Sequence, residues 1–361
     1  MTGPLRVLCL SNMWPGPADP DYGAFVADMC DALRERGLSV AVAAIDSRAS
    51  GPLRTPAKYA ALAREAMREA RRADVVYAHF LFPTGAIAAA ASRRARIPSV
   101  VTAHGQDVRN LDRRGPRRAT EGALRDASAV IAVSGYLADE LRGAGIALPP
   151  LQVVNMGVDF GRFAPGDRGA ARARLGLPGG GPLVAAVGGL TERKNPLTLL
   201  QAFARVRARR PDARLAFVGD GPLASAVDAG ARRLGIAAAV LRPGAVPHAQ
   251  VADWVTAADA LALVSRVEPL GIAALEALAA GRPVVATRAG GAREVVPDPG
   301  AGRIVDPADP VAIAAALLAV LDDPPPPEAC RRAAAPHSLE RQSERVAAIL
   351  RDAVSAGRRA R

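Results

Sequence analysis

The sequence predicts an α/β fold with two doubly wound parallel sheets that follow one another along the chain. Short β-branched segments alternate with helical segments, which indicates βαβ units and parallel strands. The alternation is interrupted by a glycine- and proline-rich region at 160–182 and then begins again. A chain of 361 residues, half of them hydrophobic, is also long for a single core, so two domains are expected.

The first domain is expected to span residues 1–165 and to be Rossmann-like. Its expected strands are 5–10, 38–45, 74–79, 99–104, 129–133 and 151–154. Its expected helices lie near 23–36, 56–72, 84–95 and 135–143. Each helix would connect two neighbouring parallel strands.

The second domain is expected to span residues 166–339 and to repeat this architecture. Its expected strands are 182–189, 214–219, 239–244, 260–264, 283–287 and 302–305. A final helical segment, about 340–361, would cross back to the first domain. A ligand crevice between the two domains follows from this arrangement.

Composition limits the class of protein. The net charge of +12 comes almost entirely from arginine, since Lys58 and Lys194 are the only lysines. Arginines on solvated helix faces are one explanation, and a basic patch for anionic lipid or a phosphorylated substrate is the other. Cys9, Cys30 and Cys330 form no CxxC motif and no Cys/His cluster, so a reducing cytoplasm fits. No segment reads as a membrane span, and the start reads as a strand rather than a signal peptide.

The stretch Ser265–Gly281 contains the strongest candidates for functional residues. Glu268 and Glu276 stand eight positions apart in an otherwise apolar segment, between the expected strands 260–264 and 283–287. Ligands bind beyond the carboxyl ends of parallel strands, where this loop and helix would lie. The amides of Leu270, Gly271 and Ile272 would open the helix and could hold phosphate, with Glu268 above the crevice and Glu276 reaching towards it. The alternative is a pair of solvated carboxylates.

Several further motifs stand in a fixed order along the chain. They are H-G-Q-D at 104–107, N-M-G-V-D-F-G-R-F-A-P at 155–165, V-G-G-L-T-E-R-K-N-P at 187–196, E-P-L-G-I-A-A-L-E-A-L-A-A-G-R-P-V-V-A-T at 268–287 and A-G-G-A-R-E-V-V at 289–296. With these motifs the sequence resembles the retaining glycosyltransferases of family 4 over almost its whole length. That resemblance implies the GT-B fold, in which two Rossmann-like domains face each other across a cleft.

The resemblance implies that the second domain binds a nucleotide diphosphate sugar. Lys194 matches the family's phosphate-binding lysine, and Glu276 would accept hydrogen bonds from the ribose hydroxyls. Glu268 would face the hydroxyls of the transferred sugar, beside the Leu270 and Gly271 amides. The family usually has arginine where this chain has Gly189, and Arg193 is the expected substitute. A surface lysine is the alternative for Lys194.

The resemblance also implies roles in the first domain. Gly23, in the loop 17–25, would let backbone approach the diphosphate, or would serve a plain turn. His104 would contact the donor sugar, and Asp107 would orient His104 or touch the acceptor. His79 would look into the acceptor cleft or be a half-buried structural histidine. His248 is expected to cap the helix 248–258 rather than to belong to the site.

The first domain offers no obvious pair of carboxylates to act as nucleophile and acid/base. For the mechanism, the resemblance implies front-face departure, in which the leaving phosphate removes the acceptor's proton. Lys194, His104 and Glu268 are the expected catalytic residues. No metal and no cofactor are expected, since lysine and amides would neutralise the phosphates and no D-x-D motif ends a strand.

The expected partners are the nucleotide-sugar donor and a saccharide, lipid-linked or small-molecule acceptor. A uridine diphosphate hexose or N-acetylhexosamine is favoured as donor on frequency alone. Arginines at 93, 94, 96, 113, 114, 117 and 118 could lie on an anionic membrane, at its cytoplasmic face. The alternatives are a sugar-nucleotide epimerase or hydrolase on the same fold and a non-catalytic polyanion-binding protein. Nucleic acid is not an expected partner, because no recognised binding motif occurs.

Overall fold

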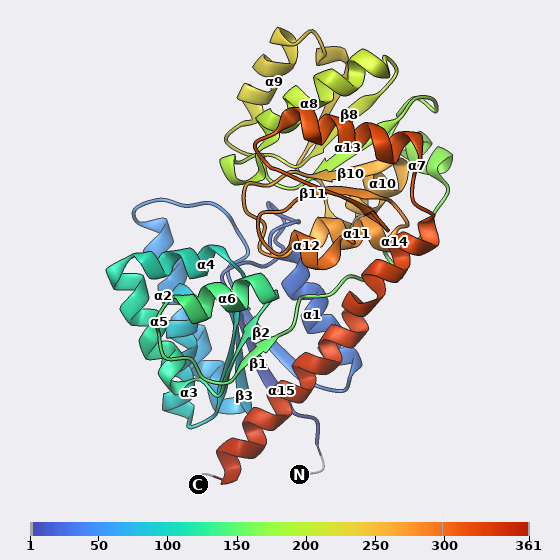
Figure 1. Cartoon of the computed structure of the whole chain (residues 1–361). Coiled ribbons are helices and arrows are strands. Elements are labelled where there is room, and N and C mark those ends of the chain that lie inside the picture. Colours follow the sequence, from blue (N-terminus) through green and yellow to red (C-terminus); the bar gives the residue numbers. More distant parts are fainter. Residues whose placement is uncertain (1–2, 298, 360–361) are drawn as a thin grey trace. The chain divides into compact units, whose positions relative to one another are not determined.

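The computed structural model describes residues 3–297 and 299–359. The chain divides into two compact units. Unit 1 holds the residues up to Gly157 and from Leu339 onward, and unit 2 is Val158–Ser338. Each unit contains a six-stranded parallel sheet with helices around it (Figure 1), so the α/β fold with two Rossmann-like sheets is confirmed. The division falls at Gly157, whereas the sequence analysis placed it at 165.

The sheet of unit 1 has the strand order β2-β1-β3-β4-β5-β6. Its strands are β1 Arg6–Ser11, β2 Ser39–Ala44, β3 Val75–His79, β4 Ser99–Ala103, β5 Ala129–Ala132 and β6 Leu151–Val153. Every residue of β3, β4 and β5 is buried, as expected for parallel strands covered on both faces. The register pairs Val7 with Val40 on one side of β1 and with Val75 on the other.

Helices cover the sheet of unit 1. They are α1 Ala24–Glu35, α2 Arg54–Glu69, α3 Ala86–Ala95, α4 Gln106–Arg109, α5 Arg114–Asp126, α6 Gly135–Gly143 and α15 Leu339–Arg359. The last of these, the long red helix of Figure 1, packs against α1, β3 and β4. Its buried residues include Val346 and Leu350, one turn apart. The sequence analysis assigned no helix to the segments that form α4 and α5.

The sheet of unit 2 has the strand order β12-β11-β10-β7-β8-β9, again all parallel. Its strands are β7 Leu183–Val187, β8 Arg214–Val218, β9 Val240–Gly244, β10 Ala260–Leu263, β11 Val284–Thr287 and β12 Gly302–Val305. The order reverses between β7 and β10, because successive strands are added on opposite sides of this pair. Such a reversal is where ligands bind in open α/β sheets.

Two groups of helices pack on unit 2. The helices are α7 Arg168–Arg174, α8 Pro196–Arg209, α9 Ala224–Arg233, α10 His248–Ala257, α11 Ile272–Ala279, α12 Ala292–Val295, α13 Pro310–Asp322 and α14 Pro327–Ala334. A buried cluster joins α8, α9 and α13 to the sheet, with Phe203, Val227 and Leu317 as contributors. Outside this cluster, α11 packs against α10 and α14. The helix α11 is almost fully apolar and buried, so its single charged residue, Glu276, needs a specific reason to be there.

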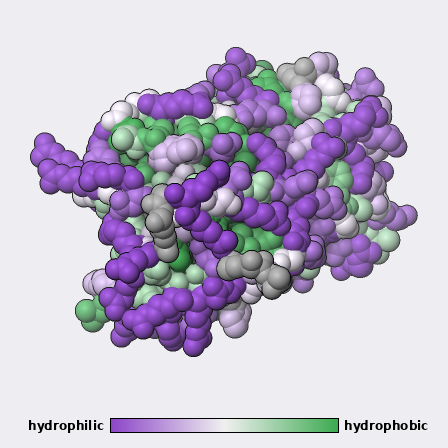
Figure 2. Space-filling model, turned by 90° about the horizontal axis from the view of Figure 1, so that it is seen from below, coloured by the Kyte–Doolittle hydropathy of each residue, from purple (hydrophilic) through white to green (hydrophobic). Residues whose placement is uncertain are grey.

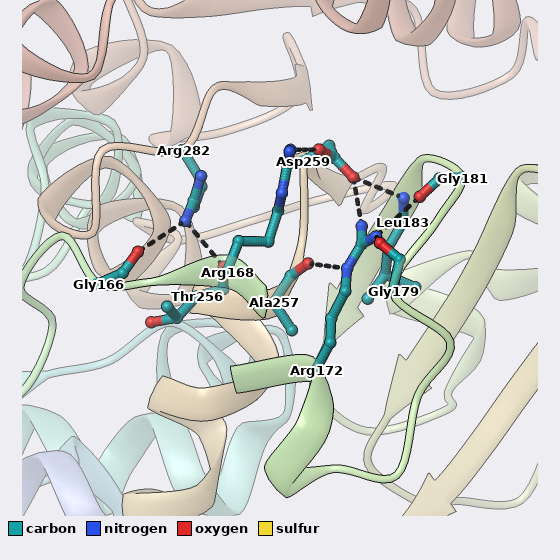
Figure 3. A network of polar contacts seen from close by, with 10 residues as sticks. All are labelled: Gly166, Arg168, Arg172, Gly179, Gly181, Leu183, Thr256, Ala257, Asp259 and Arg282. Carbon is teal, nitrogen blue, oxygen red and sulfur yellow. Dashed lines mark hydrogen bonds and ion pairs between the residues drawn. The ribbon is translucent and has the colours of Figure 1, made fainter. Parts of the chain in front are cut away.

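A polar network at the amino ends of β7 and β10 anchors the start of unit 2 (Figure 3). Asp259, directly before β10, accepts hydrogen bonds from Arg172, at 2.7 Å, from Arg168 and from the Leu183 backbone, at 2.8 Å. The buried Arg172 guanidinium also donates to the carbonyl oxygens of Ala257, Gly179 and Gly181. Asp259 therefore connects α7 and the loop before β7 to the amino ends of the strands. The sequence motifs lie at the opposite, carboxyl ends.

On the face shown in Figure 2 hydrophilic residues predominate, and hydrophobic residues show in patches between them. Many arginines pair with nearby acidic side chains, for example Arg117 with Glu121 and Arg142 with Asp139. Among residues 3–297 and 299–359, no helix is long and apolar enough to cross a membrane.

Candidate functional site

Two loops of unit 2 meet where the strand order reverses. Residues 188–195 follow β7 and residues 264–271 follow β10, and these two strands are neighbours. Gly188, Gly189, Lys194 and Ser265 are among the residues that line a small cavity of about 20 Å³ between the loops. The sequence motifs around Lys194 and Glu268 therefore come together at the edge where open parallel sheets bind ligands.

Lys194 and Glu268 form an ion pair within this site. The Lys194 Nζ lies 2.7 Å from the Glu268 Oε2, and the Ser265 hydroxyl donates to the same oxygen over 2.8 Å. Glu268 is 6% exposed, so its charge depends on these partners. Neither the pair nor the contribution of Ser265 was expected from the sequence, which placed Glu268 above an open crevice.

The loop that carries Lys194 is rigidly held. Thr191 begins the short 3₁₀ turn Glu192–Lys194, and its hydroxyl accepts from the Lys194 amide. Asn195 follows in the left-handed conformation, with φ 56°. Its carboxamide donates to the carbonyl oxygens of Val264, at 3.3 Å, and Pro307, at 2.7 Å. Asn195 therefore fixes the start of α8 to the end of β10, which sets the direction of the lysine side chain.

The site carries a surplus of positive charge. The Arg193 Nη1 lies 3.7 Å from the Glu268 Oε1. Burial by itself would raise the pKa of the Glu268 carboxyl, but the Lys194 ammonium and the Arg193 guanidinium outweigh burial and hold that pKa below its ordinary value. Glu268 is thus ionised at neutral pH, and two cations share one carboxylate. The remaining charge favours an anionic ligand.

Gly189 has no steric reason to be glycine. Its φ is not positive, and a Cβ built there would come no closer than 3.5 Å to another atom, the Asp220 carbonyl oxygen. A side chain at this position is therefore compatible with the backbone. Arg193, the expected substitute for the missing arginine, does lie in the site, beside Glu268 and partly exposed.

The start of α11 lies in the second loop. Gly271 precedes the helix with φ 97°, a conformation that favours glycine, and a Cβ there would lie 2.8 Å from the Leu263 side chain. Leu270 is buried. The first amides of a helix, that of Ile272 here, have no acceptor within the helix and carry its partial positive charge. The helix start thus adds to the positive character of the site.

The Glu276 carboxylate on α11 has a partner from α10. His248 Nε2 lies 2.8 Å from Glu276 Oε1, and Arg162 Nη1 lies 2.8 Å from His248 Nδ1. The expectation that His248 merely caps a helix is wrong: Pro247 occupies the cap position, and His248 is the first residue of α10. The sequence did hold a hint, since residues that open helices in a parallel α/β sheet lie at the carboxyl edge, where ligands bind.

In unit 1, His79 ends β3 and His104 directly follows the neighbouring strand β4, and the two rings face each other. His79 Nδ1 lies 3.1 Å from His104 Nε2. The rings of Phe25 and Phe80 lie 5.3 and 4.5 Å from the His104 ring. Burial lowers the pKa of His104 to about 3. Burial also holds the pKa of His79 well below its ordinary value, and the neighbouring His104 imidazole lowers it further, since two protonated rings would repel each other. Both histidines are therefore neutral at pH 7.

Asp107 holds the loop that carries His104. Its buried carboxylate accepts from the backbone amides of Leu81, at 2.8 Å, His104, at 3.1 Å, and Gly105, at 2.7 Å. Burial raises the pKa of this carboxyl against the opposing effect of those hydrogen bonds. Among the described residues, every hydrogen bond to this carboxylate comes from a backbone amide, so Asp107 acts on His104 by fixing the main chain around it.

Gly23 occupies a crowded position. It precedes α1 with φ 76°, and a Cβ there would lie 2.5 Å from the carbonyl carbon and oxygen of Met13. The close approach that requires glycine is thus made by this protein's own backbone. Among the described residues, no group of three or more His, Cys, Asp or Glu side chains could hold a metal ion.

Two family models match the chain. Residues 23–162 match the model described as Glycosyltransferase Family 4, and residues 167–337 match the model described as Glycosyl transferases group 1. Each match covers most of one unit. The motifs that meet in the site of unit 2 lie within the second match.

The chain is also similar to curated relatives in sequence and to solved structures in fold. The chain is 36% identical over 292 residues, 74% of its length, to D-inositol 3-phosphate glycosyltransferase 2 of Catenulispora acidiphila. It is 37% identical over 274 residues, 70% of its length, to the D-inositol 3-phosphate glycosyltransferase of Frankia alni. The chain spans 66% and 67% of the length of these two relatives. The structure of Anabaena HepE in complex with UDP and glucose shares the fold, with a TM-score of 0.77 and 23% identity over 96% of this chain and 100% of that one.

Proposed function

Because the chain belongs to glycosyltransferase family 4, we propose that it transfers a sugar from a nucleotide diphosphate sugar to a hydroxyl group of an acceptor, with retention of the anomeric configuration. The observation that carries the proposal is the site at the sheet reversal of unit 2. There Lys194 and Arg193 share one carboxylate beside the start of α11. A diphosphate is the kind of ligand that such a surplus of positive charge favours.

Lys194 would bind the diphosphate without losing Glu268. An ammonium group has three N–H donors, and Glu268 accepts from one of them. Two donors are left for phosphate oxygens, and the carboxylate keeps the lysine pointing into the site. Arg193 and the α11 amides would add further donors. This assignment needs neither a metal ion nor a cofactor.

The reaction would proceed on one face of the sugar. The bond between the anomeric carbon and the phosphate oxygen breaks while the acceptor oxygen forms its bond on the same side. The acceptor proton passes to the leaving phosphate oxygen. Lys194 and the helix amides would stabilise the charge on that leaving group, and Glu268 would hold the sugar.

The donor is proposed to be a uridine diphosphate hexose or N-acetylhexosamine. Support comes from the solved relative HepE, whose structures contain UDP or UDP-glucose. The acceptor is proposed to be a cell-envelope saccharide, a lipid-linked saccharide or a natural-product core in the cytoplasm. The names of the curated relatives add D-inositol 3-phosphate to the acceptors that an assay should include.

A face of unit 1 is proposed to contact anionic lipid. Arg64, Arg71 and Arg94 border a shallow hollow of about 640 Å³ whose floor includes Met67. Within the described ranges these three arginines take part in no ion pair, whereas Arg93, one of the arginines singled out in the sequence, pairs with Asp126. Sedimentation with phosphatidylglycerol vesicles at low salt tests the contact. Equal sedimentation of the wild type and an Arg64→Glu/Arg71→Glu variant would contradict it.

Nucleotide binding tests the proposed function directly. The purified chain is screened in a thermal-shift assay against UDP, GDP, ADP and TDP, with and without magnesium, and beside it the variants Lys194→Ala and Glu276→Ala. Arg205→Ala, which removes an exposed cation elsewhere in unit 2, is the control. We expect UDP, alone among the four nucleotides, to stabilise the wild type and the control without metal. We expect it to stabilise neither Lys194→Ala nor Glu276→Ala.

Transfer is then measured with the sugar nucleotide that binds, and NMR of the product gives the anomeric configuration. Stabilisation by none of the four nucleotides would overturn the donor class. Hydrolysis of the sugar nucleotide without transfer to any acceptor would favour the hydrolase alternative, and an inverted product would overturn retention.

A further inference from the structure

His248 links Glu276 to the segment before α7. It is the first residue of α10, and its ring lies between the Glu276 carboxylate and the Arg162 guanidinium, 2.8 Å from each. The ring also packs on Phe163, with 5.5 Å between centroids. Glu276 is 5% exposed, and among described residues no other side chain makes a hydrogen bond or ion pair with its carboxylate.

The two contacts of His248 define its tautomer. A guanidinium group only donates hydrogen bonds, so Nδ1 must accept from Arg162 and carries no proton. A neutral imidazole holds its proton on one nitrogen, which is therefore Nε2. That N–H points at Oε1 of Glu276 and donates to it. The opposite tautomer would place N–H against N–H on one side and a lone pair against a carboxylate on the other.

Arg162 is itself held in place. Its backbone amide donates to the Asp159 Oδ1 over 3.0 Å, and its guanidinium lies 3.9 Å from the Asp159 Oδ2. The turn 159–163, the start of α10 and the middle of α11 are thus connected by a chain of polar contacts that ends at Glu276. In this series of contacts Arg162 can only donate to His248, and His248 must therefore donate to Glu276.

We infer that His248 is a positioning residue for recognition of the ribose of the nucleotide. Its Nε2–H occupies Oε1 of Glu276 and fixes the rotation of the carboxylate, which leaves Oε2 as an acceptor for the ribose hydroxyls. Arg162 acts one step further away, by imposing the tautomer that donates to Glu276. This inference rests on the proposed function, because it takes Glu276 as the residue that reads the ribose.

A purely structural role for His248 makes a different prediction. If the histidine only stabilised the start of α10, its loss would weaken binding of every nucleotide equally. If it positions Glu276, its loss must reduce binding of a ribonucleotide while hardly changing the binding of the corresponding 2′-deoxynucleotide. The ratio of the two dissociation constants therefore separates the roles.

The experiment measures binding of UDP and of 2′-deoxy-UDP by calorimetry. The variants are His248→Leu, which removes both hydrogen bonds, and His248→Gln, whose amide can donate to Glu276 and accept from Arg162. Gln250→Ala, an exposed position in the same turn of α10, is the control. A hydrogen bond to a charged group is expected to make the wild type prefer UDP by about tenfold or more. His248→Leu should lose most of this preference with little change for 2′-deoxy-UDP, and His248→Gln should keep most of it.

Imidazole nitrogen NMR tests the geometry without a ligand. The His248 resonances, assigned by their loss in His248→Gln, should show the proton on Nε2, and Arg162→Met should shift the tautomer populations. A proton on Nδ1 in the wild type would overturn the inference. A wild-type preference for UDP that His248→Leu leaves intact would overturn the inference alone. Failure of the wild type to bind any of the four nucleoside diphosphates would overturn the proposed function and the inference with it.

Discussion

The Lys194 ammonium and the buried Glu268 carboxylate lie 2.7 Å apart and join the loops that follow two neighbouring strands of unit 2. This pair serves stability and ligand binding at once. Without a ligand, the Lys194 ammonium and the Glu268 carboxylate compensate each other's charge in a mostly buried environment. With an anionic ligand the lysine still has donors to offer. Substitutions in the pair should therefore change both the stability and the affinity of the protein.

Lys194→Met should destabilise unit 2 by roughly 3 kcal/mol at pH 7, because it leaves Glu268 buried without its main partner. In the wild type the Glu268 pKa is depressed, so its contribution to stability is present above the ordinary glutamate pKa of about 4.3 and is lost as the pH falls through the folded-state pKa. In the variant the carboxylate opposes folding until it is protonated.

Urea unfolding at pH 7, 5 and 4 measures this effect. The stability difference between Lys194→Met and the wild type should be largest at pH 7 and shrink towards pH 4. Lys194→Arg, which keeps the charge, should lose less. A difference that stays the same at all three values would show that the lost ion pair is not its cause.

Gly189→Arg should strengthen UDP binding by about tenfold, since it adds a charge-assisted hydrogen bond at a position with room for a side chain. Calorimetric titration with UDP checks this. Gly180→Arg adds the same charge at an open loop position and should have little effect. Arg193→Ala should weaken binding if Arg193 substitutes for the missing arginine. Weaker binding by Gly189→Arg would contradict the expectation.

Asp259→Asn should cost about 3–5 kcal/mol of unfolding free energy, because the buried Arg172 guanidinium then lacks its carboxylate. Asp253→Asn is the matched control: its partner Arg174 is 57% exposed, and the loss should stay below about 1 kcal/mol. Chemical denaturation measures both. Similar losses for the two variants would mean that the network in Figure 3 is no stronger than a surface ion pair.

Gly23→Ala should destabilise unit 1 far more than Gly37→Ala. Both glycines have a positive φ, 76° and 78°, so both substitutions carry the cost of a left-handed residue, about 1–2 kcal/mol. Only at Gly23 would the new Cβ also meet backbone, the Met13 carbonyl at 2.5 Å. Thermal unfolding separates the two costs. Equal losses would show that the loop before α1 yields to the methyl group.

Unit 1 should lose stability as the pH falls below about 6.5. Unfolded histidine takes up a proton near that pH, whereas burial keeps folded His104 neutral down to about pH 3 and depresses the pKa of His79 as well. Each histidine contributes a slope of at most about 1.4 kcal/mol per pH unit. Unfolding between pH 7 and 5 should be less pH-dependent in His79→Gln/His104→Asn. An unchanged slope would show that these histidines are accessible to protons when folded.

The sequence by itself determined the two sheets and predicted which two loops of unit 2 carry the candidate site. Runs such as residues 183–187 and 260–263 are short and apolar, and the segments between them have the period of helices, so local pattern sufficed for the elements. The segments α4 and α5 escaped this reasoning, because they are polar and α4 is a single turn. The boundary at Gly157 also escaped, since the residues after it carry the same turn signals as the rest of the connection.

Only the tertiary structure decided which side chains meet. Lys194 and Glu268 are 74 positions apart, and His248 and Glu276 are 28 apart, so no periodicity relates them. The contact between Lys194 and Glu268 follows from the order of strands in the sheet, which sets β7 beside β10 although two strands intervene in the chain. Buried charges then need partners, and the fold supplies them from whichever loops end at the same edge. That is why residue types could be assigned to the site from the sequence, while the partners that set their charge and direction could not.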